Sequence, residues 1–265
     1  MISNLPSLRR RLAENLKRVR ERIHSAAAAA RRDPAEITLV AVTKYVEIDV
    51  VRQALECGLA DLGESRAQQL NQRAGMIHEY IERRAVLAGR AERPLPRPRW
   101  HMVGHLQRNK VRMVLPWAEL IHSVDSLRLA EEIQQQAARL GRVANILLQV
   151  NVSGERSKFG VAIGAAPHLA EQFLAWSGLR LCGLMTMLPV DATYDEQRLY
   201  FDRLREVFED MAGEKVAGPH FRHLSMGMSR DFEAAIASGA TIVRIGEAVF
   251  AGLLSPNVPP PEDSD

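Results

Sequence analysis

A single lysine, Lys44, stands directly after the apolar run ITLVAVT at residues 37–43. The run is continuous rather than alternating, which is typical of a strand covered on both faces. Partial desolvation at the end of such a strand favours the neutral amine, which attacks carbonyl carbon. Lys44 is therefore a candidate for Schiff-base formation with an aldehyde or ketone. The alternative is a lysine that only ends a strand in solvent.

Two glycine-containing turns near the carboxyl terminus could bind an anion. The segments SMGMSRDFEAAIASG (225–239) and TIVRIGEAVFAG (241–252) each run from a strand-like stretch through a turn into a helical pattern. Ser229 is the expected N-cap of the first helix, and Gly246 forms the second turn. Helix N-termini present free N–H groups that bind phosphate. The alternative is that the glycines only allow tight turns.

The elements that must position these residues alternate along the chain. Strand-like runs cover residues 37–43, 59–64, 99–104, 120–124, 145–152, 179–187, 223–226 and 241–246. Helical patterns cover residues 51–58, 65–75, 126–141, 167–178, 194–213 and 230–239, and several stop at glycine. Such alternation predicts βαβ units. Eight strands in 265 residues favour a (β/α)8 TIM barrel over a doubly wound sheet.

A closed barrel would make the first and last strands neighbours, with their carboxyl ends on one face. Lys44 and the Gly246 turn would then lie side by side. An aldehyde beside a phosphate describes pyridoxal phosphate or a phosphorylated sugar. Arg244 favours pyridoxal, because an arginine near the pyridine nitrogen keeps that nitrogen unprotonated. The alternative is that Arg244 pairs with a barrel carboxylate such as Glu64.

The first helical pattern precedes the barrel. Apolar side chains recur at spacings of three and four at Leu5, Leu8, Leu12, Leu16, Val19 and Ile23. This spacing predicts an amphipathic helix that packs by its apolar stripe. The chain has 35 basic and 32 acidic side chains, and basic residues crowd this helix. We interpret them as a solvated face and expect no nucleic-acid binding.

Composition excludes several other classes. No apolar run approaches the roughly 20 residues that span a bilayer, and the N-terminus lacks a secretory pattern. Cys57 and Cys182 have no metal or redox spacing, which predicts a reduced cytoplasmic protein. His101 and His105 lie four apart but across a strand end, so no metal site is expected. Cys182, with Met185 and Met187, is interpreted as core.

Residues 1–254 are expected to form one domain, since no linker interrupts them. The tail at residues 255–265, SPNVPPPEDSD, is rich in proline and acidic residues and is expected to be disordered.

Several motifs together resemble one known family. They are AVTKYV, LGESRAQQL, WHMVGHLQRNKV, SVDSLRLAEEI, LLQVNVSGERSKFGV, LRLCGLMTM and HLSMGMSRDFEAAIASGATIVRIGEAVFAG. These segments resemble the pyridoxal-phosphate homeostasis proteins, which are similar to the N-terminal domain of alanine racemase. The resemblance covers roughly residues 12–253.

The resemblance implies a single barrel that holds pyridoxal 5'-phosphate without catalysing a reaction. It puts Lys44 at the Schiff-base position and Arg244 near the pyridine nitrogen. Ser229, Gly246 and Glu247 fall at the phosphate-binding positions. A monomer that buffers the cofactor, or delivers it to apoenzymes, is the implied function.

Four other residues bear on the resemblance. Ser65, His105 and Ala251 stand where relatives often have asparagine, proline and glycine, which leaves side contacts to the cofactor open. Lys158 is a second lysine that the family generally keeps, and it could be a secondary cofactor site or a solvated loop residue.

Two enzymatic alternatives use the same lysine. An amino-acid racemase needs a second acid or base on the cofactor face opposite the lysine. In related racemases a tyrosine from an added domain supplies it, and here only Tyr45 is expected near the site. A class I aldolase-like enzyme for a sugar phosphate would need a carboxylate beside Lys44, for which Glu64 is the candidate.

Overall fold

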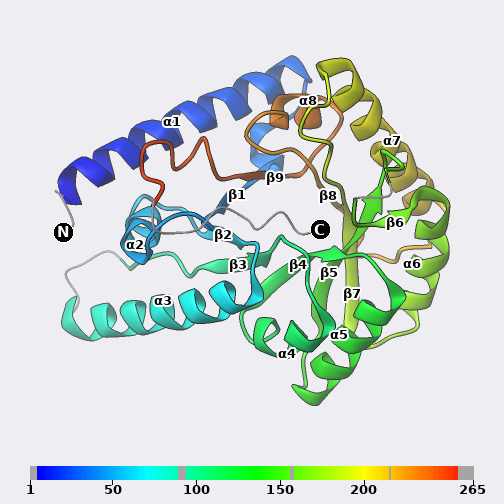
Figure 1. Cartoon of the computed structure of the whole chain (residues 1–265), viewed down its shortest axis with the longest axis horizontal. Helices are drawn as coiled ribbons and strands as arrows, with labels where there is room; N and C mark the ends of the chain where they lie inside the picture. The colour runs from blue at the N-terminus through cyan, green and yellow to red at the C-terminus, as the bar shows by residue number, and fades with distance from the viewer. Residues whose placement is uncertain (1–4, 89–93, 156–157, 215, 256–265) are drawn as a thin grey trace.

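Eight parallel strands form a closed barrel in the computed structural model, which describes residues 5–88, 94–155, 158–214 and 216–255 (Figure 1). The barrel strands are β1 (Thr38–Val42), β2 (Asp61–Glu64), β3 (Arg99–Met102), β4 (Ala118–Val124), β5 (Ala144–Asn151), β7 (Leu179–Met185), β8 (His223–Ser225) and β9 (Ile242–Ile245). They follow one another in chain order, and β9 pairs with β1 to close the ring. The predicted (β/α)8 barrel is confirmed.

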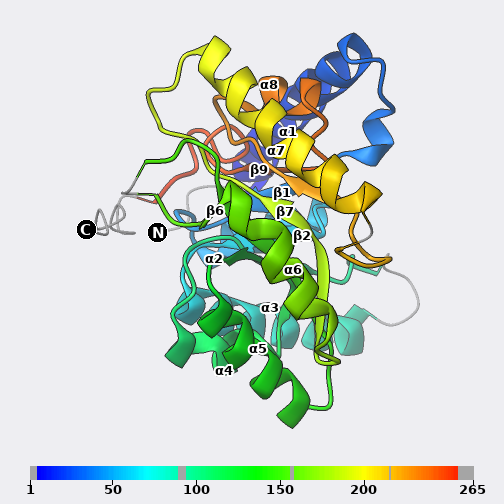
Figure 2. The same ribbon diagram turned by 90° about the vertical axis from the view of Figure 1, so that its right-hand side faces the viewer.

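Helices cover the outside of the barrel (Figure 2). They are α1 (Leu5–Ala29), α2 (Ile48–Glu56), α3 (Ala67–Ala88), α4 (Val111–Val114), α5 (Leu127–Arg139), α6 (Ala166–Leu174), α7 (Tyr194–Gly213) and α8 (Phe232–Ala237). Local signals set several of their boundaries. Ser126 caps α5, and Thr193 with Glu196 forms a capping box at the start of α7.

Two short elements escaped the sequence analysis. α4 is a single turn, and strand β6 (Val161–Ala162) has two residues and pairs with the end of β5. Elements this short carry no periodic pattern.

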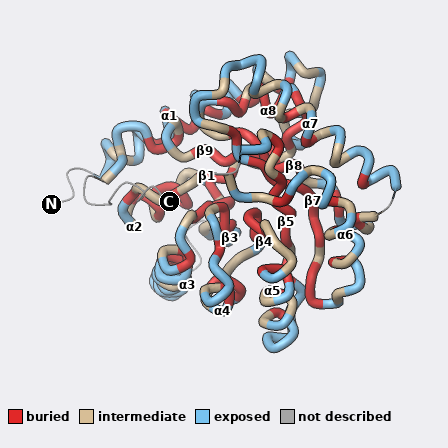
Figure 3. The backbone as a smooth tube through the Cα atoms, turned by 45° about the vertical axis from the view of Figure 1, so that its right-hand side comes forward, coloured by how far each residue is buried: buried red, intermediate tan, exposed pale blue. Residues whose placement is uncertain are grey.

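The core has two layers, and Figure 3 shows buried residues concentrated on the strands and on the helix faces that meet them. The inner cluster contains Val40, Val103, Leu120, Leu147, Cys182, Met185 and Ile242. The larger outer cluster lies between the barrel and its helices. Cys182 and Met185 are core residues as expected. Met187 is not, because it follows the end of β7 and is 42% exposed.

The N-terminal helix α1 packs along α2 and α8, as Figure 1 shows. Leu12, Leu16 and Val19 are buried, which confirms the predicted stripe, although Leu5 is exposed. The buried Asn15 amide donates to the carbonyls of residues 249 and 251 at 3.1 and 3.0 Å. α1 therefore holds the turn that follows β9.

Within the described part of the chain, no helix combines the length and apolarity needed to cross a membrane. Ser255 is anchored, because its N–H donates to the Tyr45 carbonyl at 2.9 Å. The rest of the predicted tail, residues 256–265, lies outside the described residues.

Candidate functional site

Lys44 follows the carboxyl end of β1, in the short loop that leads to α2. The neighbouring strand β9 places Arg244 opposite Val40 and carries the Gly246 turn past the end of β1. The two backbones approach so closely that a Cβ on Gly246 would lie 2.9 Å from the Val42 carbonyl oxygen. The structure therefore brings Lys44 and the Gly246 turn together, and only glycine fits at this approach.

A buried arginine holds the Lys44 loop from behind. The Arg73 side chain on α3 donates to the carbonyl of Thr43 and, at 2.6 Å, to that of Val46. It also pairs with Glu64 Oε1 at 2.6 Å. Arg73 thus fixes the backbone on both sides of Lys44. We define Arg73, Glu64 and Thr43 as the loop brace, because the Thr43 hydroxyl donates to the same carboxylate oxygen.

Glu64 is the last residue of β2 and is fully buried. Burial raises the pKa of this carboxyl group, against the opposing effects of the Arg73 charge and the Thr43 hydrogen bond. Its Oε2 atom has no hydrogen-bond partner among the described residues. The alternative pairing of Glu64 with Arg244 is wrong, because Arg73 is the partner. Sequence reasoning missed Arg73, since nothing in the sequence distinguishes it from Arg83 and Arg84 of α3.

Arg244 is buried inside the barrel and is 4% exposed. Its guanidinium donates to Ser225 Oγ at 2.7 Å and to the Thr186 carbonyl at 2.8 Å. Burial lowers the pKa of Arg244 to about 10, against the opposing charge of Asp231, so the group stays charged at neutral pH. These contacts use two of five N–H donors, which leaves donors for a ligand.

Behind Arg244, a line of hydrogen bonds crosses the barrel interior. Ser225 Oγ lies 2.8 Å from His122 Nδ1, and His122 Nε2 lies 2.9 Å from His101 Nδ1. His101 Nε2 then lies 3.1 Å from Asp61 Oδ1. We call Ser225, His122, His101 and Asp61 the buried polar chain. His101 therefore has its hydrogen-bond partners within this chain and does not pair with His105, which lies against Asp125.

The buried polar chain ends at the amino-terminal face of the barrel, where Asp61 and Arg99 line a cavity of about 400 Å3. Burial by itself raises the pKa of Asp61. Hydrogen bonds from His101 and Arg99 outweigh that effect and lower the pKa from 3.8 to about 2. Asp61 is therefore ionised at neutral pH.

The turns after β8 and β9 differ from the prediction. Ser229 is not a helix N-cap, because α8 begins at Phe232 and Asp231 holds the N-cap position. The Ser229 hydroxyl instead accepts from the N–H of Ala248 at 3.3 Å and so joins the two turns. Residues 247–249 form a turn rather than the expected helix. The physical reason is that the helix starts two residues later than a Ser229 cap requires, because residues 228–231 form a turn in which the Asp231 carboxylate accepts from the Met228 N–H.

The joined turns can still bind an oxyanion. Among the described residues, none accepts a hydrogen bond from the main-chain N–H groups of Ser229, Gly246 or Glu247. Successive free N–H groups in turns form an anion-binding concavity. The Glu247 side chain is exposed and lies 4.0 Å from Arg230, so Glu247 would contribute its N–H group.

Lys158 lies at the same end of the barrel as Lys44 but on the opposite side. Its loop follows β5, which is four strands from β1 in either direction around the ring. The Lys158 N–H donates to the Glu155 carbonyl at 3.2 Å. The structure separates the two lysines, and among the described residues Lys158 has no hydrogen bond or ion pair to the Lys44 loop.

The three departures from the family pattern have local contacts. His105 stacks on Phe159 with 4.2 Å between ring centroids, and its Nδ1 lies 3.1 Å from Asp125 Oδ2. The Ser65 carbonyl lies where a Cβ on residue 104 would stand, which requires Gly104. Ala251 offers its carbonyl to Asn15, as described above.

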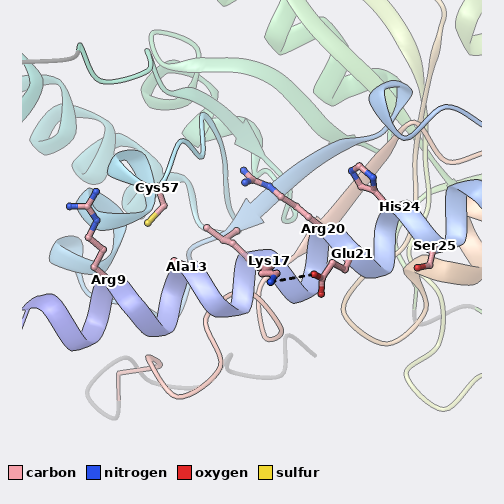
Figure 4. A pocket seen from close by; sticks show the side chains of 9 residues that line it. Arg9, Ala13, Lys17, Arg20, Glu21, His24, Ser25 and Cys57 are labelled. Atoms are coloured by element: carbon pink, nitrogen blue, oxygen red, sulfur yellow. Dashed lines mark ion pairs between the residues drawn. The ribbon is translucent and has the colours of Figure 1, made fainter.

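A groove of about 730 Å3 runs along α1, on the outside of the molecule (Figure 4). It contains Cys57 and several cationic side chains, and Lys17 in it pairs with Glu21 at 3.9 Å. The groove is away from the strand ends, so it is not the site described here. No group of three or more His, Cys, Asp or Glu residues among those described is placed to hold a metal.

Comparison with known proteins agrees with this geometry. The model for the alanine racemase N-terminal domain matches residues 9–253. The pyridoxal phosphate homeostasis protein of Pseudomonas aeruginosa is 41% identical over 239 residues, which cover 90% of this chain and 94% of that protein. The chain belongs to this family. The Escherichia coli K12 relative of the same name is 36% identical, with 90% and 95% covered.

Solved structures of similar proteins have the same fold. PipY of Synechococcus elongatus, solved with PLP bound, superposes with a TM-score of 0.76 at 28% identity and covers 91% of this chain and 100% of its own. An unknown protein of Bifidobacterium adolescentis reaches 0.84 at 34% identity, with 92% and 96% covered. Both structures therefore share the fold over more than nine-tenths of this chain.

We predict that Arg73→Met lowers the free energy of unfolding by about 3–5 kcal/mol, because it leaves the Glu64 carboxylate buried and unpaired. Urea denaturation measures the change. Arg83→Met is the matched control on α3, where the side chain is 74% exposed, and it should change stability by less than about 0.5 kcal/mol. Equal effects of the two substitutions would contradict the loop brace.

We predict that Asp61→Asn lowers stability at pH 7 by about 2 kcal/mol, since one pKa unit corresponds to about 1.4 kcal/mol. The folded pKa of Asp61 is depressed to about 2, so its stabilisation is complete above the unfolded value. It disappears as the pH falls from about 4 to 2. The difference between wild type and variant should therefore close over that range in denaturation experiments. The exposed Asp210→Asn serves as the control, and a pH-independent difference for Asp61→Asn would refute the assignment.

Proposed function

We propose that this protein holds pyridoxal 5'-phosphate as a Schiff base on Lys44 and so buffers the cofactor in the cell. The observation that carries the proposal is the approach of the braced Lys44 loop to the free N–H groups of the Gly246 turn. The names of the relatives and the PLP-bound PipY structure support it.

The residues fit each part of the cofactor. Bound pyridoxal phosphate supplies an aldehyde and an electron-withdrawing ring. The Lys44 amine suits the aldehyde, and the N–H groups of Ser229, Gly246 and Glu247 suit the phosphate. Arg244 has spare donors for the ring nitrogen.

Arg244 also favours storage over catalysis. A guanidinium that stays charged can donate a hydrogen bond but cannot accept one. A ring nitrogen that meets it is therefore held unprotonated, and an unprotonated ring withdraws electrons weakly. We infer that the cofactor is held in a form of low reactivity.

The racemase alternative lacks support from the tyrosines. Tyr80 lies on α3, and Tyr194 and Tyr200 lie on α7, all outside the barrel. Tyr45 adjoins the lysine, with Lys44 Nζ 4.7 Å from its ring centroid. None of the four stands opposite Lys44. The aldolase alternative would need Glu64 as an acid or base, but its Oε1 atom is already bonded to Arg73 and Thr43 in the loop brace.

We further propose that the protein acts as a cytoplasmic monomer that delivers the cofactor to apoenzymes. Cys57 and Cys182 are both unpaired, which suits a reducing compartment. Lys44 is partly exposed, which suits loading and release.

We predict that Lys44→Ala abolishes the visible absorption of the Schiff base and weakens cofactor binding at least tenfold. Residual binding should persist, because the N–H groups of the Gly246 turn still hold the phosphate. Spectrophotometric titration with pyridoxal phosphate measures both effects. The control is Lys17→Ala on α1, which should match the wild type. An unchanged spectrum in Lys44→Ala would refute the assignment.

A transfer assay separates carrier from catalyst. Loaded protein mixed with a pyridoxal-phosphate-dependent apoenzyme should restore its activity as the visible absorption of the donor falls. Incubation of the loaded protein with L-alanine should give no sustained formation of D-alanine. Catalytic turnover would favour the racemase alternative.

A further inference from the structure

The buried polar chain is unusual for the interior of a barrel, which branched apolar side chains normally fill. Each member of the chain is at most 9% exposed, and Ser225 and His122 are fully buried. Burying so many polar groups costs free energy unless each one is paired. The chain therefore needs an explanation beyond packing.

The direction of its hydrogen bonds follows from chemistry. Arg244 can only donate, so Ser225 Oγ accepts from it. The Ser225 hydroxyl hydrogen must then go to another acceptor, and among the described residues that acceptor is His122 Nδ1, 2.8 Å away. His122 Nδ1 is therefore unprotonated.

The tautomers of both histidines are then determined. Burial lowers the pKa of His122 well below 6.5, and the nearby charge of Arg244 acts in the same direction. Neutral His122 carries its proton on Nε2 and donates to His101 Nδ1. His101 in turn donates from Nε2 to the ionised Asp61. Every bond from Ser225 to Asp61 points the same way.

We propose that Ser225 and His122 are positioning residues for the cofactor: they keep the Ser225 oxygen turned toward Arg244 as an acceptor. The guanidinium is thereby fixed with its remaining donors toward the ring nitrogen. The Thr186 carbonyl holds its other side at 2.8 Å. This inference rests on the proposed function, because it concerns how Arg244 meets the pyridine ring.

The first test uses the apoprotein. Long-range proton–nitrogen NMR spectra of protein labelled with 15N-histidine report which ring nitrogen carries the proton. His122 and His101 should both be protonated at Nε2 and bare at Nδ1. A proton on His122 Nδ1 would overturn the proposal without any reference to the cofactor.

The second test compares two buried serines. Ser225→Ala removes the acceptor of Arg244, whereas Ser123→Ala removes a hydroxyl that is 1% exposed and has no hydrogen-bond partner among the described atoms. Ser225→Ala should weaken pyridoxal phosphate binding about tenfold and shift the visible absorption maximum. Ser123→Ala should leave both unchanged. Ser225→Thr retains the hydroxyl and should restore the wild-type spectrum.

The outcomes separate the two proposals. If wild-type protein binds no pyridoxal phosphate, the proposed function fails, whatever the histidine tautomers are. If the wild type binds the cofactor but Ser225→Ala and Ser123→Ala behave alike, only the positioning inference is overturned.

Discussion

The ion pair between Arg73 and Glu64 is the interaction on which the site depends. The Lys44 loop leaves the sheet after Thr43, so its carbonyls lose their strand partners and need others. Arg73 supplies hydrogen bonds to the carbonyls of Thr43 and Val46, and Glu64 neutralises Arg73 in its buried position. The flexible Lys44 side chain therefore extends from a backbone that these hydrogen bonds hold in place.

Barrel closure then places that lysine beside the turns that follow β8 and β9. The pairing of β1 with β9 brings Gly246 against Val42, and Asn15 of α1 secures the far side of the same turn. Arg244 enters the barrel from β9 and meets the buried polar chain. In the function that we propose, the carboxyl ends of the strands carry the ligand groups, and the interior orients one of them.

The strands could be predicted because their apolar runs are continuous. Lys44 stood out as a charge at the end of such a run, and Arg244 as the only charge within one. The role of Ser229 was mistaken, since a serine before a helix predicts a cap, while its partner Ala248 is distant in sequence. Arg73 could not be found, because its burial depends on how α3 packs. The buried polar chain joins residues of four strands, so no local sequence pattern predicts it.

The most direct test of the central claim is to reduce the protein with borohydride in the presence of pyridoxal phosphate and map the labelled peptides by mass. The chain has only five lysines, Lys17, Lys44, Lys110, Lys158 and Lys215, so the mapping is unambiguous. We predict one phosphopyridoxyl adduct, on Lys44. An unlabelled protein, or an adduct on another lysine with Lys44 unmodified, would contradict it.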